Sequence, residues 1–239
     1  MEPRVVKELK ATLGPDRVFD TPADRVAYSY DATWGEALPA VVVLPLTTAE
    51  VSATLRIANR ERIPVVPRGA ASGLSGGAVP VEGGICLGMT RMNRILEINL
   101  SELVAVVQPG VVNMDLQDAA AQHGLFFPPD PGANATVGGM LANNAAGIRT
   151  VKYGASKDNV LRMQVALADG RVVFERLFPP ADPAQPLEPS APTRWHLIVG
   201  ILSAVYAAAC RTEPELASGV VVASTVAALA LLPLWMSAR

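Results

Sequence analysis

Residues 67–77 read Pro-Arg-Gly-Ala-Ala-Ser-Gly-Leu-Ser-Gly-Gly, and residues 129–139 read Pro-Asp-Pro-Gly-Ala-Asn-Ala-Thr-Val-Gly-Gly. Where residues lack a Cβ, backbone N–H groups can converge on a pyrophosphate and bind it without a full positive charge. The first stretch alone could equally be a glycine-rich surface turn. Its occurrence together with the second stretch favours two walls of a dinucleotide site.

The spacing of these glycines excludes two other phosphate-binding loops. A Walker A loop needs Gly, four residues, and then Gly-Lys-Ser/Thr, and the chain has no Lys between Arg68 and Lys152. The Rossmann fingerprint needs Gly-x-Gly-x-x-Gly at the start of a helix, whereas the first stretch has glycines at positions 69, 73, 76 and 77. A mononucleotide kinase, a GTPase and a Rossmann dehydrogenase are therefore disfavoured.

Five stretches, in this order, resemble one family: residues 67–77, 93–98, 107–111, 127–132 and 152–154. The family is that of the FAD-linked oxidases of the vanillyl-alcohol oxidase and p-cresol methylhydroxylase (PCMH) type, and within it the D-lactate dehydrogenase and glycolate oxidase FAD-subunit branch. The resemblance covers residues 20–174. It implies an α/β (α+β) fold, a PCMH-type FAD-binding domain with two small α/β lobes and the flavin between them.

The resemblance also implies which residues bind FAD. The pyrophosphate loop corresponds to residues 68–74, and further FAD contacts correspond to residues between 130 and 147. The expected cofactor-binding residues are Arg68, Gly69, Ala70, Ala71, Ser72, Gly73, Leu74, Asp130, Pro131, Thr136, Gly138, Gly139, Asn144 and Gly147. At positions 71 and 146 this chain has Ala where relatives often carry Gly, so a left-handed backbone at either position would be strained.

FAD is expected to bind without a covalent bond, because relatives that attach it covalently often carry a His in or beside the first loop and residues 67–77 contain none. The chain has two histidines, His123 and His196. His123 is expected at the end of a helix with no catalytic role. No cluster of Cys, His or carboxylates has metal-ligand spacing, so no metal site is expected.

The composition is that of a globular protein with an apolar C-terminal part. The formal net charge is −2, and no basic stripe indicates nucleic-acid binding. Two distant cysteines, Cys86 and Cys210, and no signal-peptide pattern at residues 1–4 favour a cytoplasmic location.

Local patterns predict the secondary structure of the resembling part. Helices are expected over residues 3–13, 48–60, 113–123 and 138–146, the last with its N-terminus facing the ligand. Thr47 and Glu50 form a capping-box pattern, and Asn113 is a candidate N-cap. Strands are expected over residues 40–44, 63–66, 84–89, 94–98 and 103–107. A hairpin is expected around Asp169-Gly170.

After residue 174 the family's motifs are absent from the chain. Residues 175–194 are expected to form a proline-rich linker, since prolines recur between positions 179 and 192. Residues 195–239 form a hydrophobic tail, expected to be helical and long enough for a two-helix membrane hairpin over residues 195–236. The alternative is a frameshift or fusion product without a selected structure.

The family reaction implies a function for the whole protein. Relatives oxidise a 2-hydroxy acid such as D-lactate or glycolate: a base removes the hydroxyl proton while the Cα hydride passes to the flavin. The chain would be the FAD-binding part of such an oxidoreductase, and the catalytic residues and the electron acceptor cannot be named. The alternatives are a non-catalytic flavin-binding remnant and a membrane-tethered accessory protein.

Overall fold

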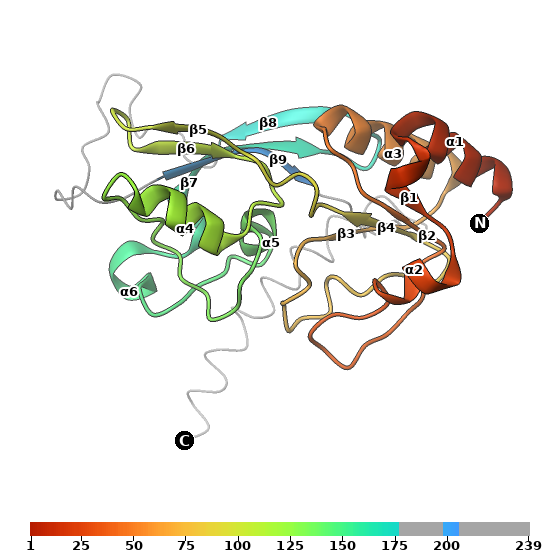
Figure 1. Ribbon diagram of the computed structural model, residues 1–239, viewed down its shortest axis with the longest axis horizontal. Coiled ribbons are helices and arrows are strands. Elements are labelled where there is room, and N and C mark those ends of the chain that lie inside the picture. Colours follow the sequence, from red (N-terminus) through yellow and green to blue (C-terminus); the bar gives the residue numbers. More distant parts are fainter. Residues whose placement is uncertain (177–197, 206–239) are drawn as a thin grey trace.

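A computed structural model describes residues 1–176 and 198–205 of the chain (Figure 1). These residues form two α/β lobes, each built on one sheet, as expected from the sequence. The elements of the first lobe are α1 (Pro3–Leu13), β1 (Val18–Phe19), α2 (Pro22–Val26), β2 (Val41–Val43), α3 (Thr48–Glu61), β3 (Val65–Arg68) and β4 (Ile85–Gly88). Those of the second are β5 (Ile95–Asn99), β6 (Val104–Val107), α4 (Asn113–Ala121), α5 (Val137–Ala142), α6 (Thr150–Tyr153), β7 (Val160–Ala166), β8 (Val172–Arg176) and β9 (Ile198–Val205).

The first sheet has the strand order β1-β2-β4-β3, in which β2, β4 and β3 are parallel and β1 is antiparallel to β2. Alternate residues of a strand point to opposite faces. Val41 and Val43 accordingly join the core under α1 and α3, whereas Val42 packs with Cys86 on the other face. The segments that follow α2 and β3 lie on that other face (Figure 1). The strand, helix, strand unit therefore delivers the chain after Arg68 to the side away from α1 and α3.

The helix α3 begins where the sequence predicts. The Thr47 hydroxyl accepts a hydrogen bond from the Glu50 N–H at 3.2 Å, which satisfies one free donor of the first turn. The Glu50 carboxylate accepts from the Leu46 N–H at 2.7 Å and pairs with Arg17. The capping residue and the acidic residue thus both hold the start of α3.

The second sheet has the order β5-β6-β9-β7-β8. The predicted hairpin is confirmed: β7 and β8 are antiparallel, and Gly170 has φ +81° in the turn, where the Asp169 carboxylate accepts from the Arg171 N–H. Leu116, Phe127 and Met140 fill the core between this sheet and the helices α4 and α5. The helix α5 lies toward the loop that follows β3 (Figure 1).

The prediction of a helical tail is wrong for residues 198–205, which form β9 between β6 and β7 and parallel to both. A continuous apolar run is compatible with a buried strand as well as with a helix, and residues 198–205 are rich in β-branched Ile and Val. The parallel edges of β6 and β7 offer the backbone partners that a strand needs. In the described residues no helix is long and apolar enough to cross a membrane. The expected linker, residues 175–194, begins too early, because residues 175 and 176 belong to β8 and extend its pairing with β7. Its other residues and the second apolar run, residues 219–236, lie outside the described residues.

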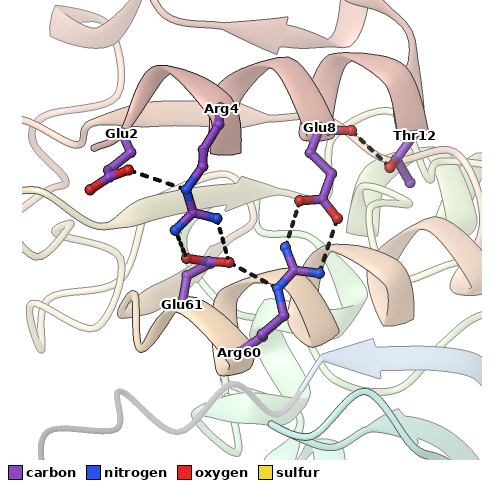
Figure 2. A network of polar contacts seen from close by, with 6 residues as sticks. All are labelled: Glu2, Arg4, Glu8, Thr12, Arg60 and Glu61. Atoms are coloured by element: carbon purple, nitrogen blue, oxygen red, sulfur yellow. Dashed lines mark hydrogen bonds and ion pairs between the residues drawn. The ribbon is translucent and has the colours of Figure 1, made fainter.

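A network of ion pairs connects α1 to the end of α3 (Figure 2). Arg4 donates two hydrogen bonds to the Glu61 carboxylate, the shorter at 2.6 Å, and Arg60 donates to Glu61 at 2.8 Å and to Glu8 at 2.5 Å. Hydrogen bonds from Arg4 and then from Arg60 lower the pKa of Glu61 to about 2, from an ordinary value of 4.5.

This lowered pKa predicts a pH-dependent contribution to stability. A carboxylate whose pKa is lower in the folded protein stabilises it above the unfolded pKa, and the contribution is lost as the pH falls through the folded pKa. We expect Glu61→Gln to lower Tm by a constant amount above about pH 5, and the difference from wild type to shrink between about pH 4.5 and 2. Thermal melts across this range measure it. The exposed Glu82, without an ion pair in the described part of the chain, provides the control Glu82→Gln, and an equal pH profile for both variants would refute the prediction.

Candidate functional site

The first glycine loop, residues 69–77, joins β3 to the segment before β4. Within the described residues, the backbone N–H groups of residues 70–77 make no hydrogen bond to the protein. A Cβ built at Gly73 would meet no protein atom closer than 3.9 Å, and one built at Gly77 would meet none within 4 Å. The loop therefore presents free donors to open space, as a site for a pyrophosphate requires.

Arg68 lies behind this loop. Its side chain is buried, and its Nη1 atom donates hydrogen bonds to the Tyr30 carbonyl at 2.6 Å and to the Ala78 carbonyl at 3.2 Å. The guanidinium also lies over the Tyr28 ring, 5.6 Å from its centroid. Arg68 therefore links the two ends of the first glycine loop to the segment after α2.

The sequence-based expectation of strain is met at one of its two positions. Ala71 has φ +56°, in the left-handed region that favours Gly. Ala146 has no positive φ, but Asn144, two residues before it, has φ +47°. The Ala71 carbonyl accepts a hydrogen bond from the Ala32 N–H at 3.1 Å. This contact helps to hold the strained residue, and Asn tolerates the left-handed region better than Ala does.

We expect Ala71→Gly to stabilise the protein. A left-handed backbone costs a residue with a Cβ roughly 1–2 kcal/mol, while the greater freedom of Gly in the unfolded chain costs about 0.4–1 kcal/mol. A net gain of roughly 0.5–1 kcal/mol should raise the urea midpoint without changing the slope of the transition. Ala146→Gly, at a position without a positive φ, serves as the control and should show no gain. A loss of stability in Ala71→Gly would mean that the residue is not left-handed in solution.

The second glycine wall, residues 129–139, meets the first glycine loop directly. A Cβ at Gly69 would overlap the Thr136 Oγ1 atom, so the absence of a side chain at position 69 permits the contact. A second contact lies at the other end of α5, where the Ser75 hydroxyl of the loop donates to Asn143 Oδ1 at 3.3 Å. The structure therefore brings together the two glycine-rich stretches that the sequence singles out.

That the N-terminus of α5 faces the ligand stays a prediction, but the N–H groups of its first turn have partners within the protein. The Val137 N–H donates to the Val111 carbonyl and the Gly138 N–H to the Pro109 carbonyl, each at 2.8 Å, while the Gly139 N–H donates to the Thr136 hydroxyl. These contacts satisfy the free donors of the first turn. The helix also ends at Ala142 rather than Ala146. Its dipole therefore points at the segment of residues 109–111.

The remaining predicted residues hold the second glycine wall in place. Asp130 forms an ion pair with Arg149 at 3.6 Å, and a Cβ at Gly147 would overlap the Asp130 carbonyl oxygen. Asn144 accepts a hydrogen bond from the Lys157 N–H through its Oδ1 atom at 3.0 Å. Pro131 is half-buried in the same wall. The close approach at Gly147 thus anchors the wall to the segment before α6.

Two amide side chains on α4 lie near the second glycine wall, and the sequence did not single them out as site residues. Gln117 both donates to the Phe127 carbonyl and accepts from the Phe127 N–H. Asn113, one turn earlier on the same face, is buried, and its Oδ1 atom has no partner among residues 1–176 and 198–205. It does not cap α4, because the N-cap is Val112. Polar residues at positions i and i+4 of an otherwise apolar helix face were the signal for both.

Comparison with known proteins shows which family has these two glycine-rich stretches. The model of one protein family, described as an FAD binding domain, matches residues 39–174. The chain belongs to this family. The cofactor of the domain is accordingly FAD, and the free N–H groups of the first glycine loop fit its pyrophosphate. The described residues contain no group of three or more His, Cys, Asp or Glu side chains placed to hold a metal ion.

The similar proteins are FAD-linked enzymes of the PCMH type, as the sequence motifs predict. The chain is 42% identical over 176 residues to glycolate oxidase subunit GlcD of Bacillus subtilis, covering 71% of this chain and 37% of the relative. It is 48% identical over 153 residues to D-lactate dehydrogenase of Archaeoglobus fulgidus, covering 62% of this chain and 34% of that relative. The structure of p-cresol methylhydroxylase with substrate bound superimposes with a TM-score of 0.63 at 26% identity, covering 72% and 34%. The FAD-binding domain therefore spans about a third of the length of these relatives.

Proposed function

We propose that this chain is the FAD-binding part of a flavin-dependent oxidoreductase that acts on a 2-hydroxy acid such as D-lactate or glycolate. The observation that carries the proposal is the first glycine loop, whose N–H groups at residues 70–77 have no partner in the described part of the protein. The names of the relatives, glycolate oxidase subunit and D-lactate dehydrogenase, supply the substrate class. FAD, when bound, accepts a hydride, and the protein supplies its position and surroundings.

The residues of this chain would bind and orient the cofactor. Backbone N–H groups of residues 70–77 would receive the pyrophosphate, with the Ser72 hydroxyl as a further donor. Thr136, beside Gly69, keeps the second glycine wall against this loop. Asp130 and Pro131 would line the flavin, held by the contacts of Gly147 and Arg149. The oxidation also needs a base for the hydroxyl proton, and we assign that role to no residue of this chain.

The uptake of FAD by the full chain tests the proposal that this chain binds the cofactor. FAD should bind at micromolar concentration, and denaturation should release all of it, because residues 67–77 contain no His for a covalent link. Equilibrium dialysis followed by acid precipitation measures both quantities. A protein that takes up no FAD, or a precipitate that stays yellow, contradicts the proposal.

The turnover of substrate tests the proposal that this chain is part of an oxidoreductase for 2-hydroxy acids. We expect the FAD-loaded chain alone to oxidise D-lactate or glycolate slowly or not at all with an artificial electron acceptor, because it spans about a third of the relatives and offers no assigned base. This coverage also favours a second candidate, a non-catalytic flavin-binding protein. Restoration of turnover by a polypeptide equivalent to the remaining part of the relatives would support the oxidoreductase. A robust rate from the chain alone would require a base within it.

A further inference from the structure

We infer that Asp31 is a positioning residue for FAD binding: its buried carboxylate accepts a hydrogen bond from the Ala78 N–H when a pyrophosphate occupies the first glycine loop, and so holds the loop in its binding conformation. The inference deepens the proposed function and rests on it. Asp31 would act through the loop, without touching the cofactor.

The starting observation is that the segment Tyr30–Thr33, here called the brace, runs along the first glycine loop. Arg68, at the start of the loop, donates to the Tyr30 carbonyl at 2.6 Å. The Ala32 N–H donates to the carbonyl of the strained Ala71 at 3.1 Å. Arg68 also donates to the Ala78 carbonyl at 3.2 Å, which ties the end of the loop to the same guanidinium. The brace therefore supports the loop along its length.

Asp31 is the buried charge of the brace, with 8% of its surface exposed. Its Oδ1 atom accepts hydrogen bonds from the Thr33 N–H at 2.8 Å and from the Thr33 hydroxyl at 2.5 Å. Its Oδ2 atom is buried and has no hydrogen-bond partner in the described residues. A buried carboxylate oxygen without a donor is costly, so a donor that could reach it with a small movement would relieve that cost.

The surroundings of Asp31 identify that donor. Burial raises the pKa of Asp31, but hydrogen bonds from Thr33, followed by the Ala78 N–H and the Arg68 charge, outweigh it and hold the pKa below its ordinary value. The carboxylate is therefore ionised at neutral pH. The Ala78 N–H lies close enough to the carboxylate to help lower its pKa, but it does not reach Oδ2 at the distance and angle of a hydrogen bond. A small shift of residue 78, at the end of the loop, would complete the bond to Oδ2.

The sign of one mutational effect separates this role from the simplest alternative. If Asp31 were only a negative charge near an anion site, its removal would reduce repulsion and tighten FAD binding. If Asp31 positions the loop, the same removal weakens binding. In Asp31→Asn the side chain keeps one acceptor for Thr33 but presents an NH2 group, which cannot accept from Ala78.

The experiment is an FAD titration of the full chain by flavin fluorescence, with thermal melts of the FAD-free protein alongside. We expect Asp31→Asn to raise the Kd for FAD about tenfold or more, the size of one lost hydrogen bond to a charged group. The Tm without FAD should change little, because Oδ2 has no partner there. The control Asp118→Asn removes the same charge from an exposed position on α4 and should leave both quantities unchanged.

A second variant removes the donor from the other side of the bond. Ala78→Pro lacks the N–H, and its effect on the Kd for FAD should not add to that of Asp31→Asn, since both remove one interaction. Unchanged or tighter binding in Asp31→Asn, or additive effects in the double variant, would overturn the inference. Failure of the unmutated chain to bind FAD would instead overturn the proposed function.

Discussion

Gly73→Val is expected to abolish the uptake of FAD while leaving the protein folded. A Cβ at position 73 would meet no protein atom closer than 3.9 Å, and Gly73 is not among the glycines with a positive φ. The isopropyl group would therefore fill the open space over the free N–H groups of residues 70–77. Loss of two hydrogen bonds to a charged phosphate, each worth about 1.5–3 kcal/mol, should raise the Kd at least about 100-fold.

The measurement is calorimetric titration of the full chain with FAD, with Tm as the readout of folding. A graded series is informative here, because Gly73→Ala should give an intermediate Kd. Ala121→Val adds bulk at the exposed last residue of α4 and should affect neither the Kd for FAD nor the Tm. Normal FAD binding by Gly73→Val would place the pyrophosphate away from the first glycine loop.

Most single elements of this fold could be predicted because their signals are local. The Thr47 and Glu50 pair marks the start of α3, and the Asp169-Gly170 turn marks the hairpin of β7 and β8. The order of strands could not be predicted in the same way. The strand β4 lies between β2 and β3 although it follows both in the sequence. Such pairing depends on contacts between distant residues, which no local pattern specifies.

The first glycine loop and the second glycine wall were evident in the sequence because both are rich in Gly. Close contacts restrict positions 69 and 147 to Gly, since a Cβ would overlap the Thr136 side chain at the first and the Asp130 main chain at the second. The brace was not evident. Residues 31–33 lie far from the loop in the sequence and belong to no recognisable motif, so only the folded chain brings Ala32 to Ala71 and Asp31 to Ala78.

The occupied N–H groups at the start of α5 could not be predicted from the sequence either. The rule that helix N-termini bind anions assumes that the first N–H groups are free. Here the carbonyls of Pro109 and Val111 occupy two of them, and the Thr136 hydroxyl receives a third. Sequence alone shows the capping Thr136 but not the carbonyls, because they come from the segment of residues 109–111, before α4.

Gly147→Ala is expected to destabilise the protein and to weaken FAD binding together. A Cβ at position 147 would overlap the carbonyl oxygen of Asp130, which is main chain and cannot rotate away as a flexible side chain would. Residues 130–131 must then move, at a cost of about 1–3 kcal/mol for an overpacked site, and they carry the part of the second glycine wall proposed to line the flavin. The hydrogen bond from the residue 147 N–H to the Thr150 hydroxyl, 2.8 Å long, remains possible in the variant. Urea unfolding and FAD titration measure the two effects. Gly132→Ala is the matched control, because it lies in the same wall but has no protein atom within 4 Å of the added Cβ. It should lose little stability in urea and little affinity for FAD. If both variants behave alike, the contact between Gly147 and Asp130 does not form in solution, and the wall must be held by Arg149 and α5 instead.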